Sequence, residues 1–198
     1  MSKETCITFI DDPNLWLKAQ KSTASGKGRR SKLQESHCDS YLPTDVGKLV
    51  ERLRRKDRTQ GSLFLYGSRP SPNDSVWKDC EKNQFKTSIY HTDGGEENKS
   101  NNSMSIDITV KAVELQVEAQ LRAKHFCDLQ AAKEKDKTIF IILAGYRNIV
   151  PAIKRVLECK IRVELWVWKS GISQVYVDLA AINSLLSVHL LDSIFKDI

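Results

Sequence analysis

The sequence predicts an α/β fold in which a mostly parallel central sheet of about five strands has helices on both faces. Short β-branched or aromatic runs alternate with longer amphipathic segments along the chain. This alternation is typical of strand–helix–strand units with parallel strands. The run "TIFIILA" (138–144) is apolar at nearly every position. A strand of that kind is buried on both faces, so we expect it in the middle of the sheet.

Five segments have the length and composition of strands. Each is rich in β-branched or aromatic residues, and turn residues bound it. In chain order these segments are "CITFI" (6–10), "SLFLY" (62–66), "KTSIY" (86–90), "TIFIIL" (138–143) and "RVELWVW" (162–168). If the strands are parallel, their carboxyl ends meet at one edge of the sheet, which makes the residues that follow each strand the first place to look for a site.

The segments between these strands show helical periodicity. "TDVGKLVERLRRK" (44–56) begins at a Thr or Asp cap and repeats apolar residues every three or four positions. A long helix is expected over 105–130, and its apolar stripe consists of Ile106, Val110, Val113, Val117 and Leu121. The other expected helices are "NDSVWKDCEKN" (73–83), "IVPAIKRVLECK" (149–160) and "YVDLAAINSLLS" (176–187).

The length of 198 residues and the 40% apolar composition predict one domain, over 5–195, with a full core. Two segments interrupt the alternation and are expected to be loops: a basic insertion over 18–42 and a polar stretch over 91–105. The net charge is +6, and its distribution is uneven. Residues 18–60 hold 12 Lys and Arg against 5 Asp and Glu, whereas the rest of the chain is nearly balanced. This region favours a polyanionic partner.

The five cysteines are widely spaced and form no CxxC pair. This spacing supports neither a disulfide framework nor a structural zinc site, so we expect free or buried thiols in a reducing compartment. No apolar run approaches the ~20 residues that a membrane span requires, and the N-terminus lacks the apolar core of a signal peptide. The expected location is the cytoplasm or the nucleus, with no membrane partner.

Polar side chains follow several of the expected strands. Asp11, Asp12 and Asn14 follow the first strand, and Asp107 lies in the expected first turn of the long helix. The remaining strand-end residues are Ser68 and Arg69 after the second strand, and Tyr146, Arg147 and Asn148 after the fourth. Ligands of open parallel sheets bind in the crevice at this edge. The sequence therefore predicts that the functional residues lie there.

Four segments, in the same order, resemble the NYN domain family, which has the PIN-like ribonuclease fold. "ITFIDDPNLW" resembles the opening strand of the family and "SIDITVKAVEL" its Val-Asp helix. The other segments are "SLFLYGSRPSPNDSVWKDCEKNQFKTSIY", which is similar to the second strand, helix and third strand, and "TIFIILAGYRNIVPAIKRVLECKIRVELWVW", which is similar to the fourth strand, helix and last strand. The resemblance covers roughly residues 5–195 and implies a PIN-like, Rossmann-like three-layer sandwich.

The resemblance also implies a chemistry. In this family, carboxylates at the strand ends hold Mg²⁺ or Mn²⁺, and the metal activates a water that attacks an RNA phosphodiester. Asp11 matches the first-strand acid of the family, Asn14 its orienting amide, and Asp107 the helix-start acid. Asp11 and Asp107 are therefore the residues to which the resemblance assigns metal binding and catalysis.

Three positions depart from the family pattern. A further helix acid of the family falls at Val113, and its two fourth-strand acids fall at Tyr146 and Asn148. A hard cation requires several anionic oxygens, whereas a phenol, with an ordinary pKa of about 10, is neutral at pH 7. Glu114 does not replace Val113, because a helix turns ~100° per residue. Mg²⁺ or Mn²⁺ would be held weakly, by Asp11, Asp107 and waters.

Nucleic-acid contacts are expected from the basic and polar residues near the crevice. They are Asn14, Ser68, Arg69 and Arg147 at the strand ends, with Arg29 and Arg30 in the insertion. The four tryptophans are interpreted mainly as packing residues, although Trp16 and Tyr146 could stack on bases.

Structural explanations remain open for the same residues. Asp11, Asp12 and Asn14 are also suited to helix capping and turns, and Asp107 to complementing a helix dipole. Lys111 and Glu114 have the spacing of a surface ion pair. The basic runs are also typical of a solvated loop and helix face.

Three hypotheses result. The first is an RNA-associated protein descended from metal-dependent ribonucleases, inactive or weakly active because metal-ligand acids are replaced at Val113, Tyr146 and Asn148. The second is an active Mg²⁺- or Mn²⁺-dependent RNA endonuclease that uses Asp11 and Asp107. The third is a protein-interaction scaffold that binds its partner through the sheet edge and the basic arm.

Overall fold

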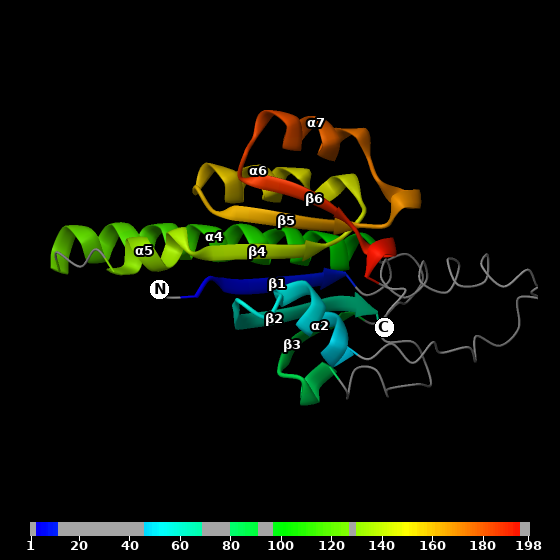
Figure 1. Cartoon of the computed structure of the whole chain (residues 1–198), viewed down its shortest axis with the longest axis horizontal. Coiled ribbons are helices and arrows are strands. Elements are labelled where there is room, and N and C mark those ends of the chain that lie inside the picture. The colour runs from blue at the N-terminus through cyan, green and yellow to red at the C-terminus, as the bar shows by residue number, and fades with distance from the viewer. Residues whose placement is uncertain (1–2, 12–45, 69–79, 91–96, 127–129, 195–198) are drawn as a thin grey trace, which may run out of the picture.

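A computed structural model describes residues 3–11, 46–68, 80–90, 97–126 and 130–194. Its centre is a six-stranded sheet with the order β3-β2-β1-β4-β5-β6, and every neighbouring pair is parallel (Figure 1). The strands are β1 (Thr5–Asp11), β2 (Thr59–Ser68), β3 (Phe85–Tyr90), β4 (Thr138–Leu143), β5 (Arg162–Val167) and β6 (Leu186–Leu190). The predicted α/β class is confirmed, with one strand more than the five expected.

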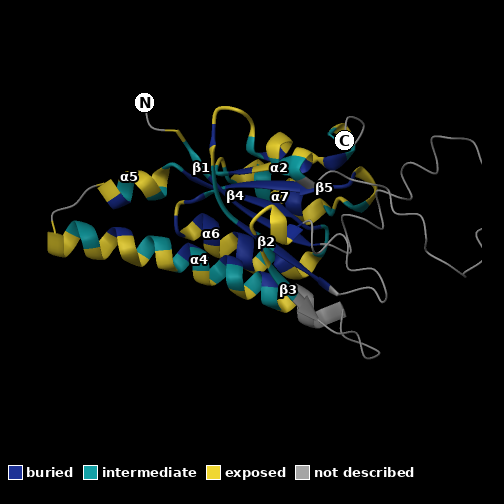
Figure 2. Ribbon diagram, turned by 90° about the horizontal axis from the view of Figure 1, so that it is seen from below, coloured by how far each residue is buried: buried dark blue, intermediate teal, exposed yellow. Residues whose placement is uncertain are grey.

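Helices cover both faces of the sheet and make three layers. On one face lie α4 (Glu97–Phe126), α6 (Val150–Glu158) and α7 (Gln174–Ile182), and on the other lies α2 (Val46–Arg54). Figure 2, which views the sheet along its edge, shows α2 above the strands and α4 below them. A short helix, α5 (Gln130–Asp136), packs beside α4. None of the helices in the described part of the chain is long and apolar enough to cross a membrane.

Each face of the sheet buries its own apolar cluster. The larger cluster joins alternate residues of the central strands, such as Phe9 and Phe140, to α4, α6 and α7. The smaller cluster joins the other set of alternate residues, such as Ile10 and Ile141, to Leu49 of α2. All six residues of β4 are buried. The expectation that "TIFIILA" forms a central strand covered on both faces is therefore confirmed.

The prediction of one helix over 176–187 was wrong for the C-terminal part of this range. The helix α7 ends at Ile182, and residues 186–190 form the edge strand β6. Asn183 explains the change of structure, because its side-chain Oδ1 accepts a hydrogen bond from the backbone N of Leu185 at 3.0 Å. Asn is a residue that competes with helical hydrogen bonding in this way. The apolar residues after it, read as a continuing helix, instead pair with β5.

The helix α4 differs from the prediction in two respects. It begins at Glu97, so residues 97–105, predicted as part of a polar loop, are helical. Four of the five residues of its predicted apolar stripe also face away from the sheet: Ile106, Val110, Val117 and Leu121 are exposed. The fifth, Val113, packs against the larger cluster, and Met104 and Ile108 are buried. The sequence pattern did not distinguish these two rows, because α4 carries apolar side chains on opposite sides. The stripe that was predicted as the apolar face of a surface helix is not its core face.

Other predicted segments lie wholly or mostly outside the described residues. The basic insertion over 18–42 belongs to this group, and so do residues 91–96 of the polar stretch. Of the helix expected over 73–83, only the last turn is described, from residue 80 to residue 82. The cysteines that are described, Cys6, Cys80 and Cys159, are buried thiols that are not joined in a disulfide.

A buried ion cluster lies across the face of the sheet that α2 covers. The guanidinium of Arg58, just before β2, donates to Glu164 Oε1 at 2.7 Å and to Glu4 Oε2 at 3.1 Å. Arg58 and Glu164 are both buried, and Arg55 lies 3.9 Å from the same Glu164 oxygen. Because these groups come from the α2–β2 connection, from β5 and from the residue before β1, the cluster ties distant segments together.

Candidate functional site at the carboxyl edge of the sheet

The strand order reverses between β1 and β4, beside Asp11. The chain leaves β1 towards β2 on one side, and leaves β4 towards β5 on the other, although β1 and β4 are neighbours. Ligands of open α/β sheets bind where the strand order reverses in this way. Asp11 is the last residue of β1, and the segment that carries Tyr146 follows β4 immediately. The predicted location of the candidate site is therefore consistent with the topology (Figure 1).

Asp11 is buried, with 2% of its surface exposed. It lies on the same face of β1 as Phe9, because alternate residues of a strand share a face, and this is the face that α4 covers. The negative charge of Asp11 helps to raise the pKa of the Tyr146 phenol. Asp11 stands at the position of the family's first-strand acid, and Tyr146 at the position of the first of its two fourth-strand acids. These two residues are therefore close in space.

Tyr146 is a half-buried, neutral phenol. Burial is the main cause of its raised pKa, followed by the charge of Asp11 and the neighbouring Tyr176. Its hydroxyl donates to Met104 Sδ of α4 at 3.3 Å, and its backbone O accepts a hydrogen bond from the hydroxyl of Tyr176. The ring packs against the larger apolar cluster. Tyr146 therefore occupies this position as part of the core and offers no anionic oxygen near pH 7.

Asp107 is held by a second phenol. The hydroxyl of Tyr66, a fully buried residue of β2, donates to Asp107 Oδ2 at 2.9 Å. Tyr66 pairs in register with Asp11. The structure thus brings Asp11 and Asp107, which are far apart in the sequence, to the same end of the sheet. Because α4 begins at Glu97, Asp107 lies far beyond the first turn, and the alternative that it complements a helix dipole was wrong.

The Tyr66–Asp107 hydrogen bond should contribute measurably to stability. Tyr66→Phe removes the only polar atom of the ring, and we expect a loss of about 1–2 kcal/mol, since a net hydrogen bond to a charged group is worth about 1.5–3 kcal/mol and Asp107 is partly solvated. Urea unfolding of Tyr66→Phe, Asp107→Ala and the double variant checks this. The two losses should be non-additive; additive losses would show that the bond contributes nothing.

Arg147 and Asn148 are exposed and follow Tyr146 in the short η1 helix (Arg147–Ile149). Arg147 Nε donates to Ser173 Oγ at 3.3 Å, just before α7. A guanidinium held in this way presents its remaining N–H donors to solvent, and it can bind a phosphate oxygen pair. Of the arginines predicted to contact nucleic acid, Arg147 is the one that the described residues include.

The remaining predicted site residues have mixed outcomes. Ser68 is the last residue of β2, and its backbone lies at the carboxyl edge beside Tyr90. Val113 is half-buried against the larger cluster, and it lies farther along α4 than Asp107. The predicted ion pair of Lys111 and Glu114 is present, with 3.1 Å between Nζ and Oε2. The predicted residues outside the described part of the chain are Asn14, Arg29, Arg30 and Arg69.

The described residues do not provide a two-metal site. They contain no group of three or more His, Cys, Asp or Glu side chains placed to bind one ion. At the carboxyl edge, one oxygen of Asp107 already accepts the Tyr66 hydroxyl, and the position next to Asp11 is a phenol. Two-metal phosphodiesterase chemistry requires two adjacent cations and correspondingly many carboxylates. The donors among the described residues fit, at most, one largely hydrated Mg²⁺.

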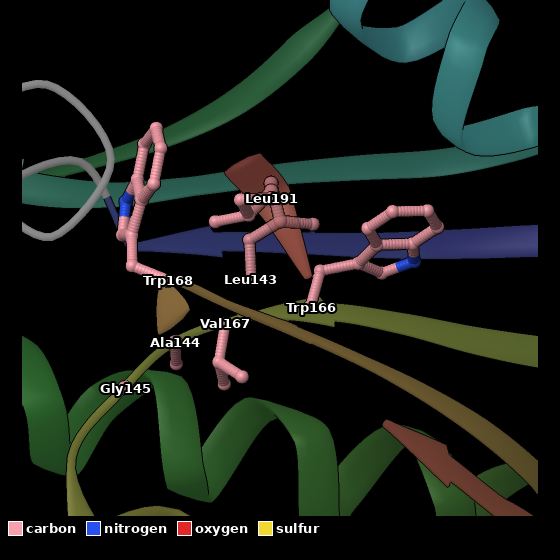
Figure 3. Close-up of a pocket in the computed structure, with 7 residues that line it drawn as sticks. All are labelled: Leu143, Ala144, Gly145, Trp166, Val167, Trp168 and Leu191. Carbon is pink, nitrogen blue, oxygen red and sulfur yellow. The ribbon is translucent and has the colours of Figure 1, made fainter. Parts of the chain in front are cut away.

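A small pocket lies near the same edge but on the opposite face of the sheet (Figure 3). Its volume of about 10 Å³ is too small for anything larger than a water molecule. Trp166 and Trp168 flank it, and both are buried. The interpretation of these two tryptophans as packing residues is confirmed, while Trp16 and Trp77 lie outside the described residues.

The sequence did not reveal the hydrogen-bond partners of Asp107 and Tyr146. Tyr66, Met104 and Tyr176 hold Asp107 and Tyr146 in place. Tyr66 and Tyr176 stand in runs that look like ordinary core sequence, and Met104 stands in the stretch that was predicted to be a polar loop. Period-two alternation in β2 places Tyr66 on the α4 face. That signal does not identify Asp107 as its acceptor, because the packing angle of α4 decides the contact.

Protein-family models and curated proteins were searched, and none matches this chain. Among solved structures, the chain is similar to VPA0982, a protein of unknown function from Vibrio parahaemolyticus RIMD 2210633. The two are 12% identical, the alignment covers 96% of this chain and 93% of the other, and the TM-score is 0.57. At this identity the likeness concerns the fold alone. The chain therefore shares the architecture of VPA0982 over nearly its whole length.

Proposed function

We propose that this protein binds RNA at the carboxyl edge of its sheet and that it has lost most or all of the cleavage activity expected of an NYN-type ribonuclease. The observation that carries the proposal is the state of the position beside Asp11. A neutral phenol stands there, its hydroxyl bonded to Met104 Sδ, where the resemblance requires a metal-binding carboxylate. The candidate site has the location that the resemblance implies for a nuclease site, but it lacks most of the negative charge of such a site.

The charge of this edge supports binding without metal. Only two carboxylates of the resemblance remain among the described residues, Asp11 and Asp107, and Asp107 is bonded to Tyr66. Arg147 is exposed, directly follows Tyr146 in the chain and is anchored on Ser173. Replacing acids by neutral groups reduces the repulsion of a phosphate backbone, and an arginine attracts it. The basic insertion, 18–42, follows β1 in the sequence and lies outside the described residues.

One observation favours the alternative of an active endonuclease. Tyr66 pairs in register with Asp11 and donates to Asp107, so both acids lie at one end of the sheet. Mg²⁺ often binds to one or two carboxylates while keeping several waters. Single-metal cleavage would then depend on both acids. Incubation of single-stranded RNA with Mn²⁺ separates the two proposals: cutting by the wild type that Asp11→Asn abolishes establishes the enzyme and overturns the binding-only function.

RNA binding should depend on salt and on Arg147. We expect Arg147→Ala to weaken binding of a fluorescein-labelled single-stranded RNA about 3- to 10-fold in 50 mM salt, because one phosphate contact is lost. The slope of log K against log [salt] should also become shallower by about 0.7. Fluorescence anisotropy measures both quantities.

The matched control is Arg155→Ala. Arg155 is another exposed arginine, in α6, and it pairs with Glu158 at 2.8 Å. Its replacement should leave the affinity unchanged. Equal losses in the two variants would mean that Arg147 acts only through net charge. Absence of any binding by the wild type at low salt would refute the RNA function and favour the protein-scaffold hypothesis.

A further inference from the structure

The side chain of His189, in the edge strand β6, packs against a buried tryptophan of β5. His189 pairs in register with Trp166, and the two rings are stacked, with 4.7 Å between their centroids and 22° between their planes. Trp166 is buried and belongs to the smaller apolar cluster, whereas His189 is half-buried. The imidazole therefore covers part of the indole at the border between the core and the solvent.

The strand β6 is short, and it has one neighbour in the described sheet. It runs over Leu186–Leu190 and pairs with β5 alone. Leu186 and Val188 pack into the larger cluster on one face, and Ser187 and His189 lie on the other face, because alternate residues of a strand share a face. Ser187 Oγ and His189 Nε2 share a hydrogen bond of 2.9 Å. On this second face, the contact of His189 with the tryptophan joins β6 to the smaller cluster.

Charged groups from two other segments face the imidazole. Glu164 of β5 stands opposite Ser187 in register, on the same face of the sheet. Glu164 Oε1 accepts a hydrogen bond from Arg58 at 2.7 Å and lies 3.9 Å from Arg55. Both arginines come from the connection between α2 and β2. The charges of all three side chains act on His189, so the imidazole lies within electrostatic reach of the buried ion cluster.

This cluster has a surplus of positive charge before His189 is protonated. Its members are three arginines and two glutamates: Arg55, Arg58, Arg162, Glu4 and Glu164. The acid that follows β6, Asp192, accepts a hydrogen bond from the backbone N of Lys169 at 2.7 Å. A proton on the imidazole adds to the positive surplus at a half-buried place, where the solvent screens charges less than at an exposed one.

The pKa of His189 is lowered in the folded chain. Burial of the imidazole is the main cause, the charge of Glu164 acts in the opposite direction, and the charges of Arg55 and Arg58 lower the pKa further. In an unfolded chain the pKa of a histidine is about 6.5. The folded state therefore binds this proton less readily than the unfolded state. The stability that neutral His189 provides is fully present above the unfolded pKa, and it is lost as the pH falls through the folded pKa.

We propose that His189 makes the attachment of β6 depend on pH, so that the strand is held in place at neutral pH and opens locally in mild acid. Histidine is the side chain whose charge ordinarily changes in this pH range. Opening uncovers Trp166 and frees one edge of β5, in which every residue after Arg162 is buried. A free strand edge of this kind pairs readily with another chain. The proposal is independent of RNA binding, because His189 takes no part in the candidate site.

Amide hydrogen exchange of the full chain at about pH 7.5 and about pH 5.5 tests the opening of β6. Protection factors are compared, since they remove the effect of pH on the intrinsic exchange rate. The amides of β6 that bond to β5 should lose protection about three-fold or more at the lower pH. They should also be less protected than those of β4 at both pH values, because β6 opens without global unfolding. Equal protection of the two strands would overturn local opening.

Two variants assign the effect to the imidazole. His189→Phe keeps an aromatic ring against Trp166 that cannot be protonated, so the protection of β6 should not change between the two pH values. The matched control is His125→Phe, which replaces an exposed histidine of α4 and should behave as the wild type. The proposal is overturned if β6 of the wild type keeps its full protection in acid, or if the loss persists in His189→Phe.

The NMR titration of the imidazole gives a readout that does not depend on exchange. The ring resonance of His189, assigned by its absence from the spectrum of His189→Phe, should titrate at a lower pH in the folded chain than in concentrated urea. Arg55→Met removes one of the two arginine charges from a half-exposed side chain and should raise the pKa of His189. A folded-state pKa equal to or above the value in urea would refute the proposal, and a further fall in Arg55→Met would refute its electrostatic basis.

Discussion

Tyr146→Asp/Asn148→Asp should turn the protein into a metal-dependent ribonuclease. The substitution places two carboxylates on the segment that lies beside Asp11, and Asp107 supplies another from α4. A hard divalent cation requires several anionic oxygens, and the variant adds two carboxylates to Asp11 and Asp107, the two acids of the resemblance among the described residues. We expect cleavage of single-stranded RNA in Mn²⁺ to rise on the order of 100-fold or more above wild type. Denaturing gels with a labelled RNA measure this rate.

The same variant gives a second readout that does not depend on cleavage. A carboxylate at position 146 approaches Asp11 in a buried place, and like charges at close range destabilise the fold. A bound cation removes this repulsion, so Mn²⁺ should raise the melting temperature of the variant and leave the wild type unchanged. Tyr146→Asn is the matched control, since it makes the same space without charge. If that control cuts equally well, the missing carboxylates are not the reason for inactivity.

Arg58→Met should cost about 3–5 kcal/mol of stability, because it leaves a buried carboxylate without its partner. Glu164 is buried, Arg58 donates to it at 2.7 Å, and Arg55, at 3.9 Å, is half exposed and too distant to replace that contact. The free energy of unfolding in urea gives the loss. Arg58→Met/Glu164→Gln should recover part of it, since the uncompensated charge is gone.

The matched control for this change is Arg155→Met. Arg155 also pairs with a glutamate at 2.8 Å, but both side chains are largely exposed, so the stability should hardly change. A similar loss in the two variants would mean that the methionine itself, and not the buried charge, destabilises the protein. The contrast isolates burial as the cause.

Patterns that depend on local sequence predicted most of this fold. The alternating and continuous apolar runs located β1 to β5, because a strand between two helical layers needs apolar side chains on both faces. β6 was missed, since it is an edge strand with partly exposed residues and follows α7 after only three residues. The core side of α4 was assigned wrongly, because both of its sides are apolar and only tertiary contacts decide which one the sheet buries.

The candidate site was predictable in place but not in detail. Parallel strands put their carboxyl ends together, so Asp11 and Tyr146 were expected at one edge. The hydrogen bonds of Asp107 to Tyr66 and of Tyr146 to Met104 join residues some forty positions apart. Contacts of that separation depend on the angle at which α4 crosses the sheet, and a single sequence does not encode that angle in any readable pattern.

The position of β1 has a consequence for the order in which the chain can fold during synthesis. β1 is the first strand of the sheet to be synthesised, yet it lies in the middle of the sheet. One of its two neighbours is β4, where Thr138 pairs with Thr5. Until β4 leaves the ribosome, one edge of an apolar strand stays open to other chains. Long-range parallel pairing is also slow. The nascent N-terminal half therefore needs shielding, and truncation before residue 138 should yield an aggregating product.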